Sequence, residues 1–424
     1  MTDISSLDPQ TLATQMAGYD TQASQSAVTK QQTSLTTQSN NLSKLKTALT
    51  TFRSSMASLN STTQGMLANT ATLSQSTVAT VTTTSQANRG TYSLTVSQLA
   101  SAQQTAYTGL TDEMVKQASG SLTLAIQDKS ISIDMGKLTS LADFADAVNQ
   151  ATDNPGVTAS LIKTDGKVQL MLSSDESGVA NALTLTTDQL DSQTAAALNQ
   201  GVEISAAKDA KVSIGSLALS SSSNKLDSLI EGVTINLQAV TATDTPLTIT
   251  VGTDTSTTQK NLQSFVDAYN SLRTVLDTQG SATGGNDGLV SSLNTELNSV
   301  IRGTANGFDM TRFGVTSDKD GKLTLNSDTL KTQLGKNPQS INQFFNSQGL
   351  LSTIDKSMNN YLSTSHGVLQ SRQEVLDRQQ SEVTDRQTKI TTRYNDAYNR
   401  YLTQFTKLKS AMQDMNNTLS SLLG

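Results

Sequence analysis

The last part of the chain has an apolar residue at every third or fourth position. Steps of four and three alternate along this C-terminal stripe, which is the spacing of a coiled-coil seam. Its members are Tyr401, Phe405, Leu408, Met412, Met415, Leu419 and Leu422. The pattern predicts an amphipathic helix whose apolar face needs a cover.

A second stripe with the same alternation lies near the other end of the sequence. The members of this N-terminal stripe are Leu42, Leu45, Leu49, Phe52, Met56 and Leu59. Val28 and Leu35 continue it backwards and Met66 continues it forwards, which predicts one rod of roughly 55–60 Å. Ser, Thr, Gln and Met flank both stripes, so we expect coiled-coil contacts with other subunits or proteins. A bundle within one chain is the alternative for each stripe.

Three further runs have a helical period. Leu369, Leu376, Val383 and Ile390 recur every seven residues, and Arg372, Gln379 and Arg386 stand between them. Those polar residues predict a weak seam. Another face holds Leu262, Phe265, Tyr269, Leu272 and Leu276. After a break at 279–288, rich in Gly, Ser and Asn, a last run holds Leu289, Leu293, Leu297 and Ile301.

The middle of the chain, from Ala71 to Asp254, has the two-residue period of strands. Apolar residues alternate in "TYSLTVSQLA" (Tyr92, Leu94, Val96) and in "GVTINLQAV" (Val233, Ile235, Leu237). We expect hairpin turns at Asp128-Lys129 and at Asp165-Gly166.

One helix is predicted among these strands. Ser140 and Asp143 have capping-box spacing at its start, and Leu141, Phe144 and Val148 lie on its inward face. The turn Asn154–Gly156 follows it.

These patterns predict an α+β fold in a discontinuous multidomain chain, with N- and C-terminal coiled-coil or helical-bundle legs around a central β-rich head of two subdomains. The terminal coiled-coil segments are expected at 1–40 and 385–424, and a helical leg domain with a small hairpin at 41–70 and 256–384. The inner head subdomain is expected at 71–104 and 202–255, and the outer one at 105–201.

Composition favours a thin, elongated protein over a large compact enzyme. The chain has 424 residues, 35% hydrophobic and only 4% aromatic, without Trp, and about three domains fit this length. The net charge of −6 leaves no basic face for nucleic acid. The absence of cysteine excludes disulfides, thiolate metal sites and Cys nucleophiles.

Targeting signals are missing from the sequence. The start, "MTDISSLDPQ", has no basic region followed by an apolar run. No window holds about 20 consecutive apolar residues, so no membrane span is expected. Taken alone, these signals predict a cytoplasmic protein.

Candidate catalytic chemistry is sparse. His366 is the only histidine, so His-based triads and zinc motifs with several histidines are incomplete, and a solvated loop position is expected for it. Asp318, Asp320 and Gly321 match three positions of a calcium loop, but Thr316 and Ser327 occupy its first and twelfth positions. A hairpin through Asp320-Gly321 is favoured there. We predict no enzyme activity, metal or cofactor, although paired carboxylates of a hydrolase remain open.

Several motifs, in order over nearly the whole length, resemble the family of flagellar hook-associated protein 2, the filament cap proteins. They include "SSLDPQTLATQM", in which Ser6 replaces the family's usual Gly, and "GTYSLTVSQLASAQ". The stretch "SLADFADAVNQATDNPGVTASLIKTDGKVQLMLSSDESG" is similar to the flagellin and hook insertion motif. Later matches are "SSSNKLDSLIEGVTINL", "FVDAYNSL", "FGVTSDKDGKLTLNSDTL", "NPQSINQFF" and "GLLSTI".

The resemblance implies a secreted protein at the flagellum tip, which replaces the cytoplasmic expectation. It implies a ring-shaped homo-oligomer on the filament end that promotes the insertion and polymerisation of exported flagellin. The implied partners are further copies of the chain, flagellin, hook–filament junction proteins and an export chaperone. No nucleic acid, cofactor or membrane span is implied.

Three alternatives stay open at this point. A surface adhesin could bind mucin or another host ligand through the head. A hydrolase using Asp or Glu could be hidden in the head. A hook–filament junction protein is the nearest alternative among flagellar proteins.

Overall fold

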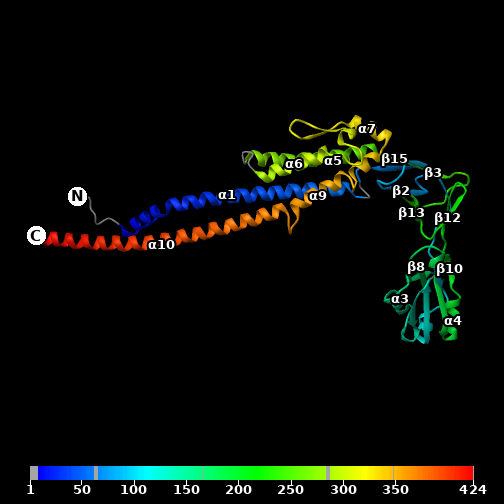
Figure 1. Ribbon diagram of the computed structural model, residues 1–424. Coiled ribbons are helices and arrows are strands. Elements are labelled where there is room, and N and C mark those ends of the chain that lie inside the picture. The colour runs from blue at the N-terminus through cyan, green and yellow to red at the C-terminus, as the bar shows by residue number, and fades with distance from the viewer. Residues whose placement is uncertain (1–7, 62–64, 165, 283–286, 347, 424) are drawn as a thin grey trace. The chain divides into compact units, whose positions relative to one another are not determined.

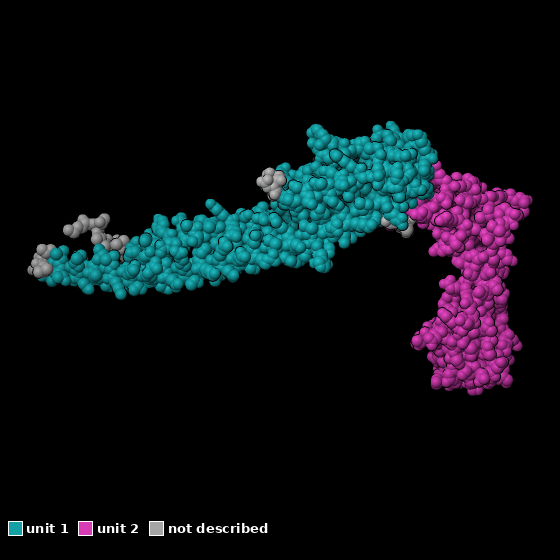
Figure 2. Space-filling view, in the orientation of Figure 1, with its two compact units in different colours: residues 1–60, 259–424 teal, residues 61–258 magenta. Residues whose placement is uncertain are grey.

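The structure is a computed structural model, and it describes residues 8–61, 65–164, 166–282, 287–346 and 348–423. It contains two compact units, each described separately below (Figure 2). Unit 1 is formed by the two ends of the chain, residues 1–60 and 259–424, and unit 2 by residues 61–258. The two ends therefore fold together, with the middle of the sequence inserted between them.

Unit 1 is mainly helical. Its helices are α1 (Pro9–Leu59), α5 (Thr255–Ala282, which begins in unit 2), α6 (Gly288–Arg302), α7 (Ser327–Lys336), α8 (Gln339–Phe345), α9 (Leu350–Leu362) and α10 (Val368–Leu423). A 3₁₀ turn, Met310–Phe313, precedes the two-stranded sheet of β16 (Val315–Ser317) and β17 (Leu323–Leu325). Helices α1 and α10 lie side by side and antiparallel (Figure 1).

Helix α1 has defined signals at both of its ends. Asp8 caps the start, where its carboxylate accepts the backbone N–H groups of Gln10 and Thr11, and Pro9 occupies the first turn. The helix ends at Leu59, with Asn60 as its C-cap. The prediction of one rod from Val28 to Met66 is therefore wrong at its C-terminal end, because the helix stops seven residues before Met66. The sequence after Leu59 holds Asn60, three Ser or Thr residues and Gly65, which are poor helix formers, and Met66 is buried in unit 2.

The seam of α10 differs from the prediction by one residue. Leu369, Leu376 and Val383 are buried and Ile390 is half-buried, but Arg372, Gln379 and Arg386 are exposed. Gln373, Gln380 and Gln387, four residues after each apolar position, are half-buried instead. The steps of four and three that lead back from Tyr401 reach these glutamines, so the seam is continuous with the C-terminal stripe.

Hydroxyl side chains on α1 bond back to the helix itself. The Oγ1 atoms of Thr21, Thr33, Thr36 and Thr37 donate to the carbonyl four residues earlier, at 2.9 Å in each case. These bonds satisfy the hydroxyls locally. A helix rich in Thr can therefore stay helical without polar partners.

The core of unit 1 gathers around α5. The five residues predicted for the inner face of α5 are all buried. On α6, Leu293, Leu297 and Ile301 are buried as predicted. Leu289 is only half-buried, and Val290 is the buried residue at the start of that face. Phe265 packs edge-on against Phe345, with ring centroids 5.4 Å apart. The predicted hairpin is confirmed, because β16 and β17 pair around the Asp318–Gly321 turn. Part of the 279–288 break, residues 283–286, lies outside the described residues.

Unit 2 contains two hydrophobic cores. The first core is built on an antiparallel sheet in the order β1-β15-β3-β11-β12 and a second sheet in the order β13-β14-β2. Its strands are β1 (Asn69–Leu73), β2 (Ala79–Thr83), β3 (Gly90–Gln98), β11 (Ala210–Ile214), β12 (Leu217–Ser221), β13 (Lys225–Ile230), β14 (Val233–Leu237) and β15 (Leu247–Thr253). The predicted alternation holds, because Leu94, Val96, Val233, Ile235 and Leu237 are buried.

The second core lies in the sequence between those strands. Its sheets have the orders β10-β4-β8-β7 and β6-β5-β9. The strands are β4 (Gln104–Tyr107), β5 (Gly120–Ile126), β6 (Lys129–Asp134), β7 (Val157–Thr164), β8 (Lys167–Ser174), β9 (Thr184–Leu190) and β10 (Val202–Ser205). The helices are α2 (Asp112–Gln117), α3 (Leu141–Asn149) and α4 (Ser192–Asn199), with short 3₁₀ turns at Met135–Lys137 and Val179–Asn181.

Local predictions for this second core are confirmed. Ser140 caps α3, and Leu141, Phe144 and Val148 are buried. Strands β5 and β6 form the first predicted hairpin, but its turn is Gln127-Asp128, one residue earlier than predicted, because Lys129 pairs with Ile126. Strands β7 and β8 form the second hairpin, whose turn residue Asp165 lies outside the described residues. The chain is therefore an α+β protein with helical ends around a β-rich head of two subdomains. The exact boundaries predicted for its four domains stay a prediction.

Candidate assembly surface

The C-terminal stripe lies along α10 and is largely exposed. Leu408, Met415 and Leu419 are 51%, 66% and 51% exposed, while Tyr401, Phe405 and Met412 are half-buried. The side chain of Leu422 lies outside the described residues. The six described residues thus form one continuous apolar face.

The exposure follows from the register of the two long helices. Gln25 lies opposite Gln387 and Gln32 lies opposite Gln380. This register places Asp8, the first described residue, level with residue 404 of α10. Beyond that level no described part of α1 covers α10. Tyr401 is the last stripe residue with a polar contact to α1, through its hydroxyl and Asp20 at 3.1 Å.

The N-terminal stripe has the opposite environment. Each of its six residues is at most 8% exposed, and Leu49 is fully buried. Helices α9 and α10 pack against α1, and Phe52 meets the Tyr269 ring of α5 edge-on at 6.5 Å. The bundle within one chain, which the sequence left open, therefore describes this stripe. Its role in contacts between subunits stays a prediction.

Two glutamine pairs join α1 to α10, and the sequence analysis missed them. Gln25 and Gln387 exchange two hydrogen bonds of 2.9 and 2.8 Å, and Gln32 and Gln380 exchange bonds of 3.0 and 2.8 Å. The pairs lie seven residues apart on both helices. A polar pair in a seam fixes the register at a cost in stability. The seven-residue spacing of glutamines in both segments was the available signal.

A groove of about 620 Å³ runs between α1 and α5. This α1/α5 groove has Phe52 and Leu272 at its base, and both side chains are buried. Lys44 is the one charged residue among those that line it. Small and polar side chains make up most of the walls. The groove therefore carries little charge and leaves room for large apolar side chains.

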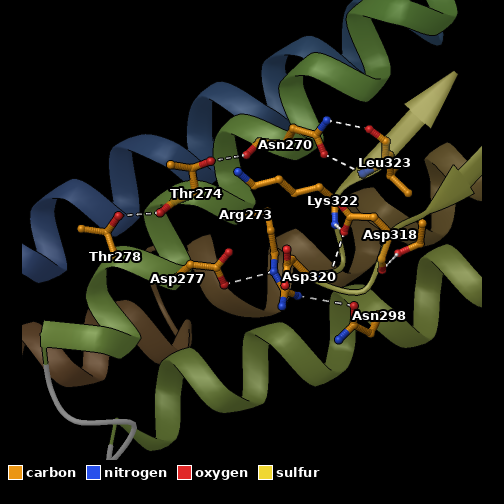
Figure 3. Close-up of polar contacts among 11 residues, drawn as sticks. Asn270, Arg273, Thr274, Asp277, Thr278, Asn298, Asp318, Asp320, Lys322 and Leu323 are labelled. Atoms are coloured by element: carbon orange, nitrogen blue, oxygen red, sulfur yellow. Dashed lines mark hydrogen bonds and ion pairs between the residues drawn. The ribbon is translucent and has the colours of Figure 1, made fainter.

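On the other side of α5, a polar cluster fixes the β16–β17 hairpin to the helices (Figure 3). The Arg273 Nε atom lies 3.1 Å from the Asp277 carboxylate, and Arg273 also contacts Asn298. Asn270 donates to the Leu323 carbonyl and accepts its N–H, both at 2.8 Å. Gly321 has a φ of +79°, and a Cβ there would lie 3.1 Å from the Arg273 guanidinium carbon, so glycine allows the close approach.

The acidic residues of this cluster and the single histidine make contacts that stabilise local turns. The Asp318 carboxylate accepts the N–H groups of Asp320 and Lys322, so it closes the hairpin turn. His366 is exposed in a turn, where Nδ1 lies 2.9 Å from the Ser365 hydroxyl. Among the residues that the structure describes, no group of three His, Asp or Glu side chains is placed to hold a metal ion.

No helix in the described ranges is long and apolar enough to cross a membrane. At the start of α1, hydrogen bonds from the Thr11 hydroxyl and N–H and from the Gln10 N–H hold the pKa of Asp8 below its usual range. In the second core of unit 2, burial raises the pKa of Tyr107 to about 12. These shifts have local structural causes.

Comparisons with known proteins agree on one family. The family model for the flagellar hook-associated protein 2 C-terminus matches residues 207–417, and that for its N-terminus matches residues 5–103. The flagellin hook IN motif matches residues 121–176.

Similarities over about four fifths of the chain point the same way. The lateral flagellar hook-associated protein 2 of Vibrio parahaemolyticus is 32% identical over 79% of this chain and 81% of its own. The A-type protein of Pseudomonas aeruginosa is 28% identical, again over 79% of each chain. The crystal structure of the D1-D2-D3 domains of the flagellar cap protein FliD from Escherichia coli is 28% identical with a TM-score of 0.68, over 79% of this chain and 99% of that one. The chain therefore belongs to the family of flagellar hook-associated protein 2.

Proposed function

We propose that the protein caps the distal end of the bacterial flagellar filament, outside the cell. There it promotes the insertion and polymerisation of exported flagellin, without covalent chemistry. Family membership and the similarity to a solved flagellar cap protein support this role. The observation that carries the mechanism is the exposure of the C-terminal stripe, because a continuous apolar face on the end of a helix requires partner helices.

The energetics of the stripe favour assembly. Burying a Leu, Met or Phe side chain contributes about 1.5–3 kcal/mol, so the five such residues of the described stripe can contribute on the order of 10 kcal/mol before ordering costs. The proposed covers are helices of neighbouring copies in a ring, of flagellin, or of hook–filament junction proteins. An export chaperone is a further proposed partner, since the same face needs cover before export.

Unit 2 would supply the plate of the cap. Its second core contains the segment that matches the flagellin hook IN motif. Its two compact cores are built from strands and short helices, and such packed cores suit a rigid platform. The exposed stripe, in contrast, belongs to unit 1. We propose that the plate retains flagellin subunits and that the helical ends attach the cap to the growing filament.

A truncation tests this division of roles. A chain that ends at Arg400 lacks the C-terminal stripe but keeps the α1 core and all of unit 2. We expect circular dichroism to show a folded protein that fails to restore filament growth in cells without their own cap protein. A full-length control with Gln404, Ser410 and Asn417 changed to Ala alters exposed polar positions only and should restore growth. Normal filaments with the truncated chain would refute the proposed attachment.

A further inference from the structure

A polar pocket of about 650 Å³ lies between α5, α6 and the β16–β17 hairpin. All of its lining residues belong to unit 1, and this α5/hairpin pocket shares none of them with the α1/α5 groove. Charged and amide side chains make up most of its lining. Its volume is within the range of small-molecule sites, about 300–1,000 Å³. The pocket is therefore large and polar enough to hold a charged small molecule.

Two residues that line this pocket each have a buried polar atom without a hydrogen-bond partner. The atoms are Oδ1 of Asn294 and Nε of Arg273. The Arg273 Nε atom lies 3.1 Å from the Asp277 carboxylate as an ion pair, but its N–H makes no hydrogen bond there. Among the residues that the structure describes, no other buried side-chain nitrogen or oxygen is left unbonded. Buried polar atoms are normally hydrogen-bonded, so two unbonded atoms in one pocket indicate where a ligand binds.

Two cationic side chains of the pocket add positive charge. Arg302 is the last residue of α6 and Lys322 follows the hairpin turn, and within the described ranges neither has an ion-pair partner. Both are exposed, so they can turn toward a ligand. Burial raises the pKa of the nearby Tyr269 hydroxyl, and the charges of Arg273 and Arg302 oppose that rise. The two guanidinium groups therefore lie near one another.

The carboxylates that line the pocket already have partners (Figure 3). Asp277 pairs with Arg273, and Asp320 pairs with Lys319 at 3.0 Å. Asp318 accepts two backbone N–H groups of the hairpin turn, both at 2.9 Å. What the pocket offers to a ligand is therefore two positive charges, a guanidinium N–H donor and an amide oxygen acceptor.

We propose that the α5/hairpin pocket binds a phosphate group together with a hydroxyl donor, as hydrogen phosphate or a sugar phosphate provides. The phosphate oxygens accept hydrogen bonds from Arg273, Arg302 and Lys322, and such charge-assisted bonds are strong. The hydroxyl donates to the Asn294 Oδ1 atom. At a charge of about −2, the phosphate group matches the two cations that have no carboxylate partner. Free phosphate and a sugar ester share this chemistry, because the sugar hydroxyls supply the donor in the ester.

Simpler occupants satisfy only part of this pattern. A water molecule can bond to both unbonded atoms, but it brings no negative charge to the two cations. Sulfate brings the charge, but it has no hydrogen to donate to Asn294. The proposed partners of the phosphate group come from α5, α6 and the hairpin, so binding should hold these three elements together and stabilise unit 1 against unfolding. This ligand site does not depend on the proposed cap function.

Isothermal titration calorimetry of the purified full chain tests the choice of ligand. At about pH 8, above the second pKa of a phosphate group, inorganic phosphate should bind at one site per chain. Sulfate has the same charge but no donor hydrogen, so it should bind about tenfold more weakly. Glucose 1-phosphate separates the two sources. Tighter binding than inorganic phosphate identifies a sugar ester as the ligand, and weaker binding identifies free phosphate.

Three variants test the position of the site. Arg302→Gln removes an exposed cation of the pocket and should weaken phosphate binding about tenfold. Arg372→Gln removes the same charge from an exposed position on α10 that does not line the pocket, and it should leave binding unchanged. Asn294→Leu removes the acceptor, so it should lower the affinity for phosphate to that for sulfate without changing sulfate binding.

Circular dichroism verifies that each variant is folded before titration. Equal affinities for phosphate and sulfate in the unchanged chain would overturn the proposed ligand. Equal losses from Arg302→Gln and Arg372→Gln would overturn the proposed position, because they would show that phosphate responds only to the net charge of the chain. No measurable binding of inorganic phosphate or glucose 1-phosphate would overturn the site itself.

Discussion

Two stripes with the same three-four spacing have opposite environments in this protein. The stripe on α1 is buried among α5, α9 and α10, and Leu49 and Phe52 are 0% and 1% exposed. The stripe on α10 is open, and Met415 is 66% exposed. The period of a sequence therefore predicts that a helix has an apolar face, but the register of its neighbours decides whether that face is covered.

The difference has a simple geometric cause. The glutamine pairs fix α1 against α10, and in that register the described part of α1 ends level with residue 404. No described part of α1 covers the stripe residues after this level. A stripe that is covered contributes to folding, and a stripe that is open is available for assembly.

The largest expected effect comes from truncating one phenylalanine in each stripe. Phe52→Ala removes a fully buried ring and should lower the free energy of unfolding of unit 1 by about 3–5 kcal/mol. Phe405→Ala removes a half-buried ring at the open end and should change it by less than about 1 kcal/mol at concentrations that keep the protein monomeric. Urea denaturation followed by circular dichroism measures both. If both variants lowered the free energy of unfolding by similar amounts, the two stripes would not differ in their contribution to folding.

A smaller effect is expected at the glutamine pairs. Gln387→Leu leaves the Gln25 amide without its partner and should cost about 0.5–1.5 kcal/mol. The double variant Gln25→Leu with Gln387→Leu should recover that loss, because two apolar side chains then meet in the seam. A double-mutant cycle measures the coupling. Gln379→Leu, one position outside the seam and exposed, is the matched control and should show no coupling to Gln25.

The smallest effect concerns the capped start of α1 and depends on pH. The pKa of Asp8 is lowered in the folded state, so the cap contributes fully above the ordinary carboxyl pKa of about 3.9 and is lost as the pH falls below it. Hydrogen exchange, corrected for intrinsic rates, should show the first turn of α1 losing protection below about pH 4. The amides of α10 after Tyr401 provide the internal reference. Asp8→Asn should abolish this pH dependence, and a persistent dependence would show that another group controls the helix start.

Much of the fold was predictable because its signals are local. The capping residue Ser140, the alternation through β14 and the hairpin at Gly321 each act within a few residues. The end of α1 was missed because Met66 continues the numerical spacing, although the residues after Leu59 are poor helix formers. Spacing alone does not report where a helix stops.

The assembly surface was only half predictable. The apolar period identified both stripes, but burial of one and exposure of the other depend on contacts between segments more than 300 residues apart in the sequence. The glutamine pairs have no hydrophobic signal, so the apolar spacing predicts the seam one residue away, at Gln379 and Arg386. The small residues of the α1/α5 groove become recognisable only when two distant helices are placed together.

The near absence of charge on α1 has a consequence for the medium in which the protein works. From Thr21 to Ser43 the helix carries a single ionic side chain, Lys30, and its threonine hydroxyls bond to their own backbone. Dissolved ions screen exposed ion pairs within about 10 Å at 0.1 M, but they have little to screen here. Along this stretch, the contact between α1 and α10 should therefore change little with the ionic strength of the surrounding medium.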